Sequence, residues 1–211
     1  MSARIGIDVP DGAVGNWSVQ SFEVNRDASR ATRLRAALKG DRDLFVPAGH
    51  YKRLVCGEDV VMSNTPMEVR TNAAFIRAAR GDVLIHGLGL GMVLKAILAK
   101  RSVRSVLVVE KHREVIELVG PTYHADPRVH IVHEDALEFT GLRGQRFDVA
   151  WHDIWTWISD ENLPEMFRLH RRWGRRVGWQ GSWCRDACED MRAGAHRRLP
   201  VAWHGAQLVR P

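Results

Sequence analysis

The chain has 211 residues, of which 45% are hydrophobic and 27% charged, as is usual for a soluble globular protein with one main domain. No window approaches the roughly 20 continuous apolar residues of a membrane span, and the start "MSARIGIDVPDG" lacks the basic and apolar regions of a signal peptide, so we expect a cytoplasmic protein without a membrane partner. The three cysteines argue against a disulfide framework, and the formal net charge of +6 favours anionic partners without establishing nucleic-acid binding.

The first part of the chain predicts a small N-terminal extension, residues 1–64. Residues 1–25 mix Gly, Pro, Asp and Asn without a clear period and predict an irregular segment. The segment 27–40 is rich in Ala, Arg and Leu and stops at Gly40, which predicts a helix with a glycine C-cap. Two runs of β-forming residues around "CGED" then predict a β-hairpin over 44–64.

A second, larger unit is predicted over residues 65–211. It opens with a helix over 65–81, with Thr65 as N-cap and Pro66 at the first helical position. Strands and helices then alternate, and apolar strands are predicted at residues 82–87, 104–110, 128–134 and 147–153. Because nearly continuous apolar strands separated by helices are typical of a parallel sheet covered on both faces, the predicted fold class is α/β and Rossmann-like.

The last part of the chain is rich in arginine and tryptophan. It predicts a helix, a fifth strand, a second helix and a terminal strand or hairpin at residues 163–177, 177–183, 185–194 and 200–209. The arginines of residues 168–176 are either a solvated helix face or the phosphate-binding surface of an RNA- or partner-binding module, and nucleic-acid contact is not the favoured interpretation. Cys184, Cys188 and His196 lack a fourth ligand for a structural zinc site, so no metal is expected.

The stretch "VLIHGLGLG" (83–91) is an apolar run that enters a glycine-rich turn. Such a turn can present backbone N–H groups and a positive helix end to a ligand, and Gly87, Gly89 and Gly91 permit both the turn dihedrals and a close approach. The spacing is GxGxG, with Met92 where the dinucleotide turn GxGxxG has its last small residue, and no "GK[ST]" follows. A nicotinamide oxidoreductase and a Walker A loop are therefore disfavoured, and a tight corner without a ligand stays open.

Carboxylates end or follow the next three predicted strands. Glu110 stands about twenty residues after the glycines, where it can accept hydrogen bonds from both hydroxyls of a ribose. Asp135 lies in "VHEDALEF", either beside an adenine edge together with the backbone of Ala136 or as a helix N-cap. Asp153 ends "FDVAWHD". Since ligands of open α/β sheets lie outside the carboxyl ends of the strands, these groups are expected to face one crevice.

The ordered set "VLIHGLGLG", "VLVVEKHREVIEL", "VHEDALEF" and "FDVAWHDIW" resembles the class I S-adenosylmethionine-dependent methyltransferases over residues 65–190. The resemblance, and not the spacing, implies S-adenosylmethionine as the cofactor. It implies cofactor contacts from His86, Gly87, Leu88, Gly89, Gly91, Glu110, Lys111, Asp135, Ala136 and Asp153. Many of these enzymes have an acidic residue just before the glycines, so His86 either contacts the methionine moiety differently or packs under the turn.

Two branches of this superfamily share further segments with the chain. Spermidine synthases have "VLVIGGGDGG", an acidic end of strand two, a "GDA"-type turn and "FDVIIVD" in the same order, which makes aminopropyl transfer an alternative function. Here Leu90 replaces the aspartate of their glycine turn, and the tyrosine and paired acids that hold a polyamine are not recognisable. The segment "VVMSNTPMEVRTNAAF" is similar to guanidinoacetate N-methyltransferases, with Ser63 and Asn64 in place of Trp-Glu, and we take Asn64 and Glu68 as candidate acceptor contacts.

Methyl transfer needs the alignment of two reactants and the management of one proton. Asp153 is the preferred group for orienting or deprotonating the acceptor, with His152 as the alternative base, and strand alternation predicts that only one of them faces the crevice. Trp155 and Trp157 are expected to flank its mouth, although core packing is the commoner role of tryptophan. The leading prediction is a methyltransferase acting on N or O of a small molecule or side chain, with a homodimer as one option for its assembly.

Overall fold

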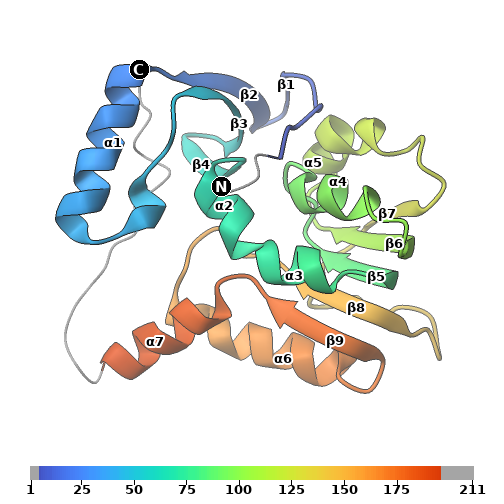
Figure 1. The fold of residues 1–211 in the computed structure, drawn as a ribbon. Helices are drawn as coiled ribbons and strands as arrows, with labels where there is room; N and C mark the ends of the chain where they lie inside the picture. Colours follow the sequence, from blue (N-terminus) through green and yellow to red (C-terminus); the bar gives the residue numbers. More distant parts are fainter. Residues whose placement is uncertain (1–4, 196–211) are drawn as a thin grey trace.

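The computed structural model describes residues 5–195, and these form two β-sheets with surrounding helices (Figure 1). The larger sheet has the strand order β7-β6-β5-β8-β9, and every neighbouring pair in it is parallel. Its strands are β5 (Gly81–His86), β6 (Val103–Glu110), β7 (Val129–His133), β8 (Phe147–His152) and β9 (Val177–Ser182). The first strand of this sheet is central and the order reverses beside it, as in a doubly wound sheet, so the predicted Rossmann-like fold class is confirmed.

Helices cover both faces of the larger sheet because its strands alternate between two apolar clusters. Val83 and Ile85 belong to the cluster that includes side chains of α3 (Ala73–Ala78), α4 (Met92–Leu98) and α5 (Arg113–Val119). Leu84 packs with Phe139 and Trp173 on the opposite face, beneath α6 (Leu163–Trp173). The turn after β5 therefore lies at the edge of a sheet that is buried on both sides.

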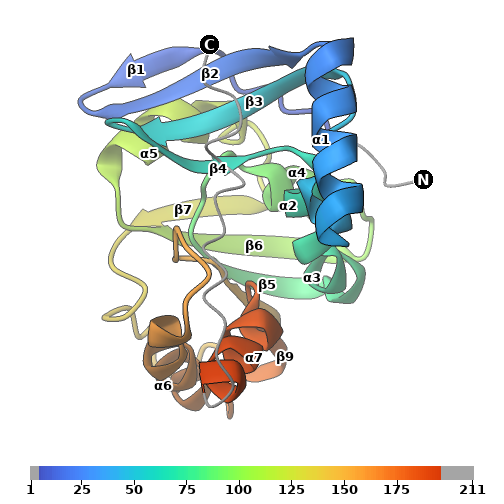
Figure 2. The ribbon, with the colours of Figure 1, turned by 90° about the vertical axis from the view of Figure 1, so that its left-hand side faces the viewer.

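The prediction of an irregular segment over residues 1–25 is wrong for residues 12–24, which form two strands, and is confirmed for residues 5–11. Strands β1 (Gly12–Val14) and β2 (Trp17–Val24) pair with each other and with the predicted hairpin, β3 (Gly49–Cys56) and β4 (Asp59–Ser63), to form an antiparallel sheet in the order β1-β2-β3-β4. The pair Gly15-Asn16 between two β-forming runs is a hairpin signal that the composition of the segment obscures. Figure 2 shows this sheet above strands β5, β6 and β7 of the larger sheet.

The predicted helix at 27–40 is confirmed, and the one at 65–81 is shorter and divided. Helix α1 (Arg26–Lys39) ends at Gly40, whose φ of 64° is left-handed, as expected of a glycine C-cap. Helices α2 (Pro66–Thr71) and α3 meet at Asn72, and Thr65 makes no side-chain cap. The fully buried Asn72 amide donates to the Glu68 carbonyl and accepts from the Trp151 indole, and such side-chain bonds to the backbone compete with a regular helix.

The C-terminal elements follow the predicted order. Helix α6 stops at Trp173, before the predicted end, because Val177 starts strand β9, and α7 (Arg185–Ala195) follows. Short 3-10 turns lie at Arg42–Leu44, Gly120–Thr122 and Asp160–Asn162. The strand or hairpin predicted at 200–209 lies outside the described residues. Between residues 5 and 195, no helix combines the length and apolar composition that crossing a membrane requires.

Two fully buried histidines lie between the larger sheet and α6. The Nδ1 atoms of His86 and His152 are 2.9 Å apart, and the His86 ring also packs against Trp173. Burial lowers the pKa of both imidazoles, that of His152 to about 3, because the charged ring would lose its hydration. Both rings are therefore neutral in the folded protein near neutral pH.

These histidines predict acid sensitivity. Since the unfolded chain binds protons near pH 6.5 and the folded chain does so only at much lower pH, the free energy of unfolding should fall as the pH drops below about 6.5, by about 1.4 kcal/mol per pH unit for each histidine. The variant His152→Gln should lose less stability than the wild type between pH 7 and pH 5 in urea unfolding. His130→Gln, at an exposed site on β7, is the control. Parallel pH curves for wild type and His152→Gln would contradict the assignment.

Candidate functional site

A cavity of about 240 Å³ opens at the carboxyl ends of β5, β6 and β8, below the antiparallel sheet. Most of the residues that the sequence indicates meet there. They are Glu68, Gly87, Leu88, Gly89, Glu110, Lys111, Asp135, Ala136, Asp153 and Trp155. The structure thus brings segments from five places in the chain to one crevice, where the strand order of a doubly wound sheet predicts a ligand.

Five candidates lie elsewhere, and for three of them the structure gives a different role. His86 and His152 are buried on the α6 side of the sheet, away from the cavity. His86 therefore packs under the turn, and the prediction of His152 as an alternative base is wrong. The buried Asn64 side chain accepts from the Lys52 amide and donates to the Ile5 carbonyl, which is a structural task. The other two, Gly91 and Trp157, are not among the residues lining this cavity.

The three glycines of the turn are required by the packing of the protein itself. Their φ angles are 92°, 50° and 69°, and a Cβ would lie 2.0 Å from the Asp153 carbonyl oxygen at Gly87 and 2.2 Å from the Met62 sulfur at Gly89. At Gly91 a Cβ would enter the ring of Tyr123, whose hydroxyl donates to the Gly91 carbonyl. The turn is therefore a tight corner that also forms one wall of the cavity.

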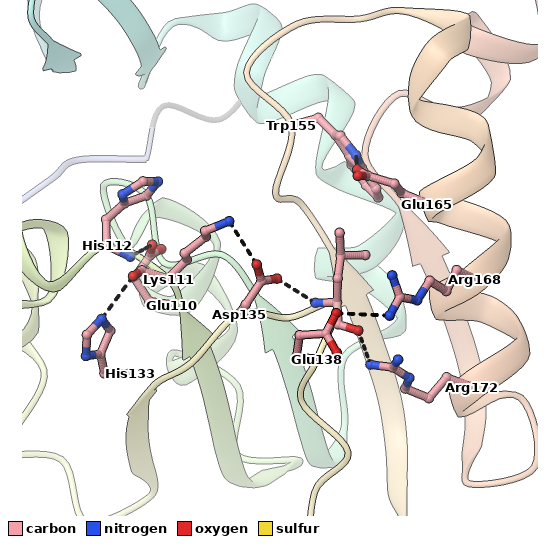
Figure 3. Close-up of polar contacts among 11 residues, drawn as sticks. Glu110, Lys111, His112, His133, Asp135, Glu138, Trp155, Glu165, Arg168 and Arg172 are labelled. Atoms are coloured by element: carbon pink, nitrogen blue, oxygen red, sulfur yellow. Dashed lines mark hydrogen bonds and ion pairs between the residues drawn. The ribbon is translucent and has the colours of Figure 1, made fainter.

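Glu110 links the turns that follow β5 and β6, and Figure 3 shows its side chain beside His112 of the second turn. Its Oε2 accepts from the Leu88 amide and its Oε1 from the His112 amide, both at 2.8 Å, and only 6% of the residue is exposed. Each carboxylate oxygen has two acceptor sites, so each retains one for a ligand. The predicted role toward a ribose is compatible with this geometry.

Asp135 takes the capping role within a turn, and its place beside an adenine edge stays a prediction. Its Oδ1 accepts from the Leu137 amide at 2.8 Å, as in a cap, and its Oδ2 pairs with the Lys111 ammonium at 2.8 Å (Figure 3). The hydrogen bond from Lys111 lowers the pKa of the Asp135 carboxyl. Ala136 is buried beside it and lines the cavity, so this segment presents a fixed carboxylate and a backbone edge together.

Two carboxyl groups from distant parts of the chain face the same cavity. Burial raises the pKa of Glu68 to about 8, with the nearby Asp153 charge adding to the shift, and burial raises the pKa of Asp153 to about 7. Such a pair titrates as a unit, because the first charge opposes the second. The sequence did not show paired acids, since Glu68 lies on α2 and Asp153 follows β8, and only folding places them together.

The cavity is acidic although the whole chain is basic. Five carboxyl side chains line it, from Glu68, Glu110, Asp135, Asp153 and Glu165. Its one lysine, Lys111, is paired with Asp135. Glu165 accepts from the Trp155 indole at 2.7 Å, which fixes the tryptophan at the cavity wall. The local charge balance thus favours a cationic ligand.

Several residues that line the cavity were not predicted from the sequence. Met62 accepts the Leu90 amide on its sulfur at 3.0 Å and so lies on the glycine turn. Trp17, in the segment predicted to be irregular, stacks near His112 with ring centroids 4.6 Å apart. Trp183 donates to Thr71 and is 4% exposed. All three are apolar residues of strands or strand ends, so no local pattern separates them from core residues.

The arginines near α6 mostly serve the fold. Arg172 donates to the Leu137 and Phe139 carbonyls, and Arg168 pairs with Glu138. Arg176 donates to loop carbonyls of residues 140–145 and lies over the Trp173 ring. A phosphate contact by these three side chains would compete with bonds within the chain, so nothing in their placement favours the RNA-binding alternative.

Cys184, just before α7, and Cys188, within α7, also have a packing role. Cys188 is 1% exposed and packs with Leu163 and Met166. Burial raises the pKa of the Cys184 and Cys188 thiols, which disfavours the thiolate form that binds metals. Among the residues that the structure describes, no group of three His, Cys, Asp or Glu side chains is placed to hold a metal ion. His196 of the candidate set lies outside that range.

The sheet order defines a Rossmann-like fold, with the cavity at the carboxyl edge of its parallel sheet. No family model matches the chain. It is 38% identical over 77 residues to polyamine aminopropyltransferase 2 of Caldanaerobacter subterraneus subsp. tengcongensis, covering 34% of this chain and 26% of the relative. It is 26% identical over 140 residues to the polyamine aminopropyltransferase of Pyrobaculum aerophilum, covering 59% and 48%. The chain thus spans less than half the length of these curated relatives.

Similar solved structures are mostly S-adenosylmethionine-dependent methyltransferases and include a spermidine synthase. The spermidine synthase of Thermotoga maritima has a TM-score of 0.43 and 19% identity, over 76% of this chain and 52% of that one. The methyltransferase CcbJ of Streptomyces caelestis has a TM-score of 0.39 and 23% identity, over 52% and 45%. The class I methyltransferases and the spermidine synthases that the sequence resembles are both represented among these structures.

The buried acid pair predicts a stability change with the opposite pH dependence to that of the histidines. Because the folded-state pKa of Glu68 lies above that of the unfolded chain, its cost is absent at low pH and grows as the pH rises toward about 8. The variant Glu68→Gln should raise the melting temperature relative to wild type at pH 8.5 and change it little at pH 4. Glu117→Gln, on the surface of α5, is the control. A gain at pH 4 as large as at pH 8.5 would contradict the shifted pKa.

Proposed function

We propose that this protein transfers an alkyl group from an S-adenosyl sulfonium donor to an amine. The observation that carries the proposal is the placement of the Glu68 and Asp153 carboxyl groups in the same cavity as Glu110 and the glycine turn. In the leading form of the proposal the donor is S-adenosylmethionine and the group is methyl.

The residues that would hold the donor lie along the carboxyl edge of the sheet. Glu110 retains acceptor sites for the two ribose hydroxyls, and the segment Asp135–Leu137 offers a wall for the adenine. Gly87 and Gly89 bring backbone to the cavity without side chains. When bound, the sulfonium supplies a carbon whose bond to sulfur breaks as the amine nitrogen bonds to it, leaving a neutral thioether.

The carboxyl pair suits an amine acceptor for two reasons. First, an amine arrives as a cation, and the acidic cavity attracts it in a chain of net charge +6 that would otherwise repel it. Second, the ammonium must lose a proton before its nitrogen can attack. With a pKa of about 7, Asp153 is ionised often enough to accept that proton and is a strong enough base to use it. Glu68 then orients the amine beside it.

A second candidate is aminopropyl transfer, for which the donor is decarboxylated S-adenosylmethionine. The names of the two curated relatives favour it, and so does the acid pair that the sequence did not reveal. A donor without a carboxylate also suits a cavity in which the single lysine is already paired. Mass spectrometry of an amine incubated with each donor separates the candidates, since the product gains either one methyl or one aminopropyl group.

Donor binding should depend on Glu110. In Glu110→Gln one amide N–H group faces a backbone N–H of Leu88 or His112, which leaves a buried donor unpaired and removes an acceptor from the ribose. We expect at least a tenfold loss in affinity for S-adenosylhomocysteine, measured by calorimetry below the melting temperature of the variant. Glu117→Gln should bind as the wild type does. Equal affinity in Glu110→Gln would remove this residue from the donor site.

Turnover should depend on Asp153. Asp153→Asn keeps the size of the side chain but cannot accept a proton, so turnover should fall by about 10²-fold or more while donor affinity stays within about twofold. For wild type, kcat should decline as the pH falls below about 7, and this decline should disappear in the residual activity of the variant. A variant with full activity and an unchanged pH profile would exclude Asp153 as the base.

A further inference from the structure

A second cavity of about 390 Å³ adjoins the first. It lies between helix α1, the strands β2 to β4, helix α2 and the segment after β8. Five residues line both cavities: Val61, Met62, Glu68, Thr156 and Trp183. Glu68, which forms the acid pair with Asp153 in the first cavity, therefore lies at the junction of the two cavities.

The walls of the second cavity are mainly apolar beyond this junction. They include Phe22, Val24, Leu44, Val46, Val60 and Met67. Val24 is 2% exposed and Met67 is 5% exposed, so these two residues form a buried part of the wall, while Ala28, Ala31 and Arg35 of α1 are exposed. Trp157, which the sequence assigned to the mouth of the crevice, lines this second cavity and is 43% exposed.

The polar groups of these walls are poorly placed to hold a second charge of a ligand. Asp43 is paired with Arg70. The Thr32 hydroxyl is bonded to the backbone of Ser29 and Val46. Glu23 lies at an exposed position, where water screens its charge. A second ammonium group inside this cavity would therefore lose hydration without gaining a free buried partner.

We infer that the second cavity holds the body of the acceptor, and that the acceptor is a primary amine with one charged end and an apolar body, of the arylalkylamine or alkylamine class. Its nitrogen lies at Glu68 and Asp153, and its apolar part extends past Met62 and Trp183 into the second cavity. This inference rests on the proposed function for the fate of the amine, but the binding it requires is measurable without a donor.

The test uses calorimetry on the full chain. It compares monoamines of increasing length, and then a monoamine with a diamine of the same length. Butylamine, hexylamine and octylamine should bind with affinity that rises by about fourfold per methylene while the chain is being buried. Hexylamine should bind at least tenfold more tightly than 1,6-diaminohexane, which differs by the second ammonium. Diamines that bind as tightly as the monoamines, or an affinity independent of chain length, would overturn the inference.

Substitutions in the wall of the second cavity test whether the apolar part of the amine binds there. Val46→Trp fills the second cavity and should weaken octylamine binding at least tenfold while leaving S-adenosylhomocysteine binding unchanged. Val60→Phe is a smaller change at the same wall and serves if the first variant does not fold. Leu38→Trp, at a position of α1 that is 79% exposed, is the control. Octylamine affinity that is unchanged in a folded cavity variant would place the ligand elsewhere and overturn the inference.

The outcomes separate this inference from the proposed function. Cavity-dependent binding of octylamine without any transfer from either sulfonium donor would support the amine site and contradict the transfer reaction. Transfer to 1,4-diaminobutane but not to hexylamine would support the reaction and overturn the apolar acceptor. Transfer to hexylamine with a raised KM and an unchanged kcat in Val46→Trp would support both.

Discussion

The Glu110 carboxylate determines the shape of the candidate site, because it bridges two turns at the carboxyl edge of the parallel sheet. By accepting the amides of Leu88 and His112, it fixes the turn after β5 against the turn after β6. The buried Leu88 amide would otherwise lack a partner. The same carboxylate keeps an open acceptor site on each oxygen, so a group that holds the fold together is also available to a ligand.

The antiparallel sheet closes the cavity from above. Met62 on β4 receives the Leu90 amide, and Trp17 on β2 lies against His112. These contacts explain why the glycine turn tolerates no Cβ at Gly89, since the Met62 sulfur occupies that space. The N-terminal sheet is thus part of the candidate site, and it also contributes one wall of the second cavity.

The distribution of charge argues for function more strongly than the total charge does. A net charge of +6 suggested anionic partners, but the cavity collects five carboxyl groups. Several arginines near α6 donate hydrogen bonds to backbone carbonyls and so stabilise the fold. Burial raises the pKa of Glu68 and Asp153, and that of Asp153 is brought close to neutrality, where a carboxyl group is useful as a base.

The sequence by itself determined the parallel sheet and the crevice at its edge. Apolar strands alternating with helices encode the sheet locally, and the ends of such strands lie on one edge whatever the loops do. Gly87, Glu110, Asp135 and Asp153 could therefore be placed together in advance. The β1–β2 strands were hidden by a composition rich in turn residues, although Gly15-Asn16 marks their hairpin.

Tertiary structure alone decided the direction of individual side chains and the pairing of distant ones. His86 follows the apolar alternation of β5 and turns away from the cavity, beneath α6. Glu68 on α2 and Asp153 after β8 meet although they are far apart in the chain. The approach of these two acids has no signature in a local pattern. It depends on how the two elements pack, and that packing sets which groups lose water and which face a ligand.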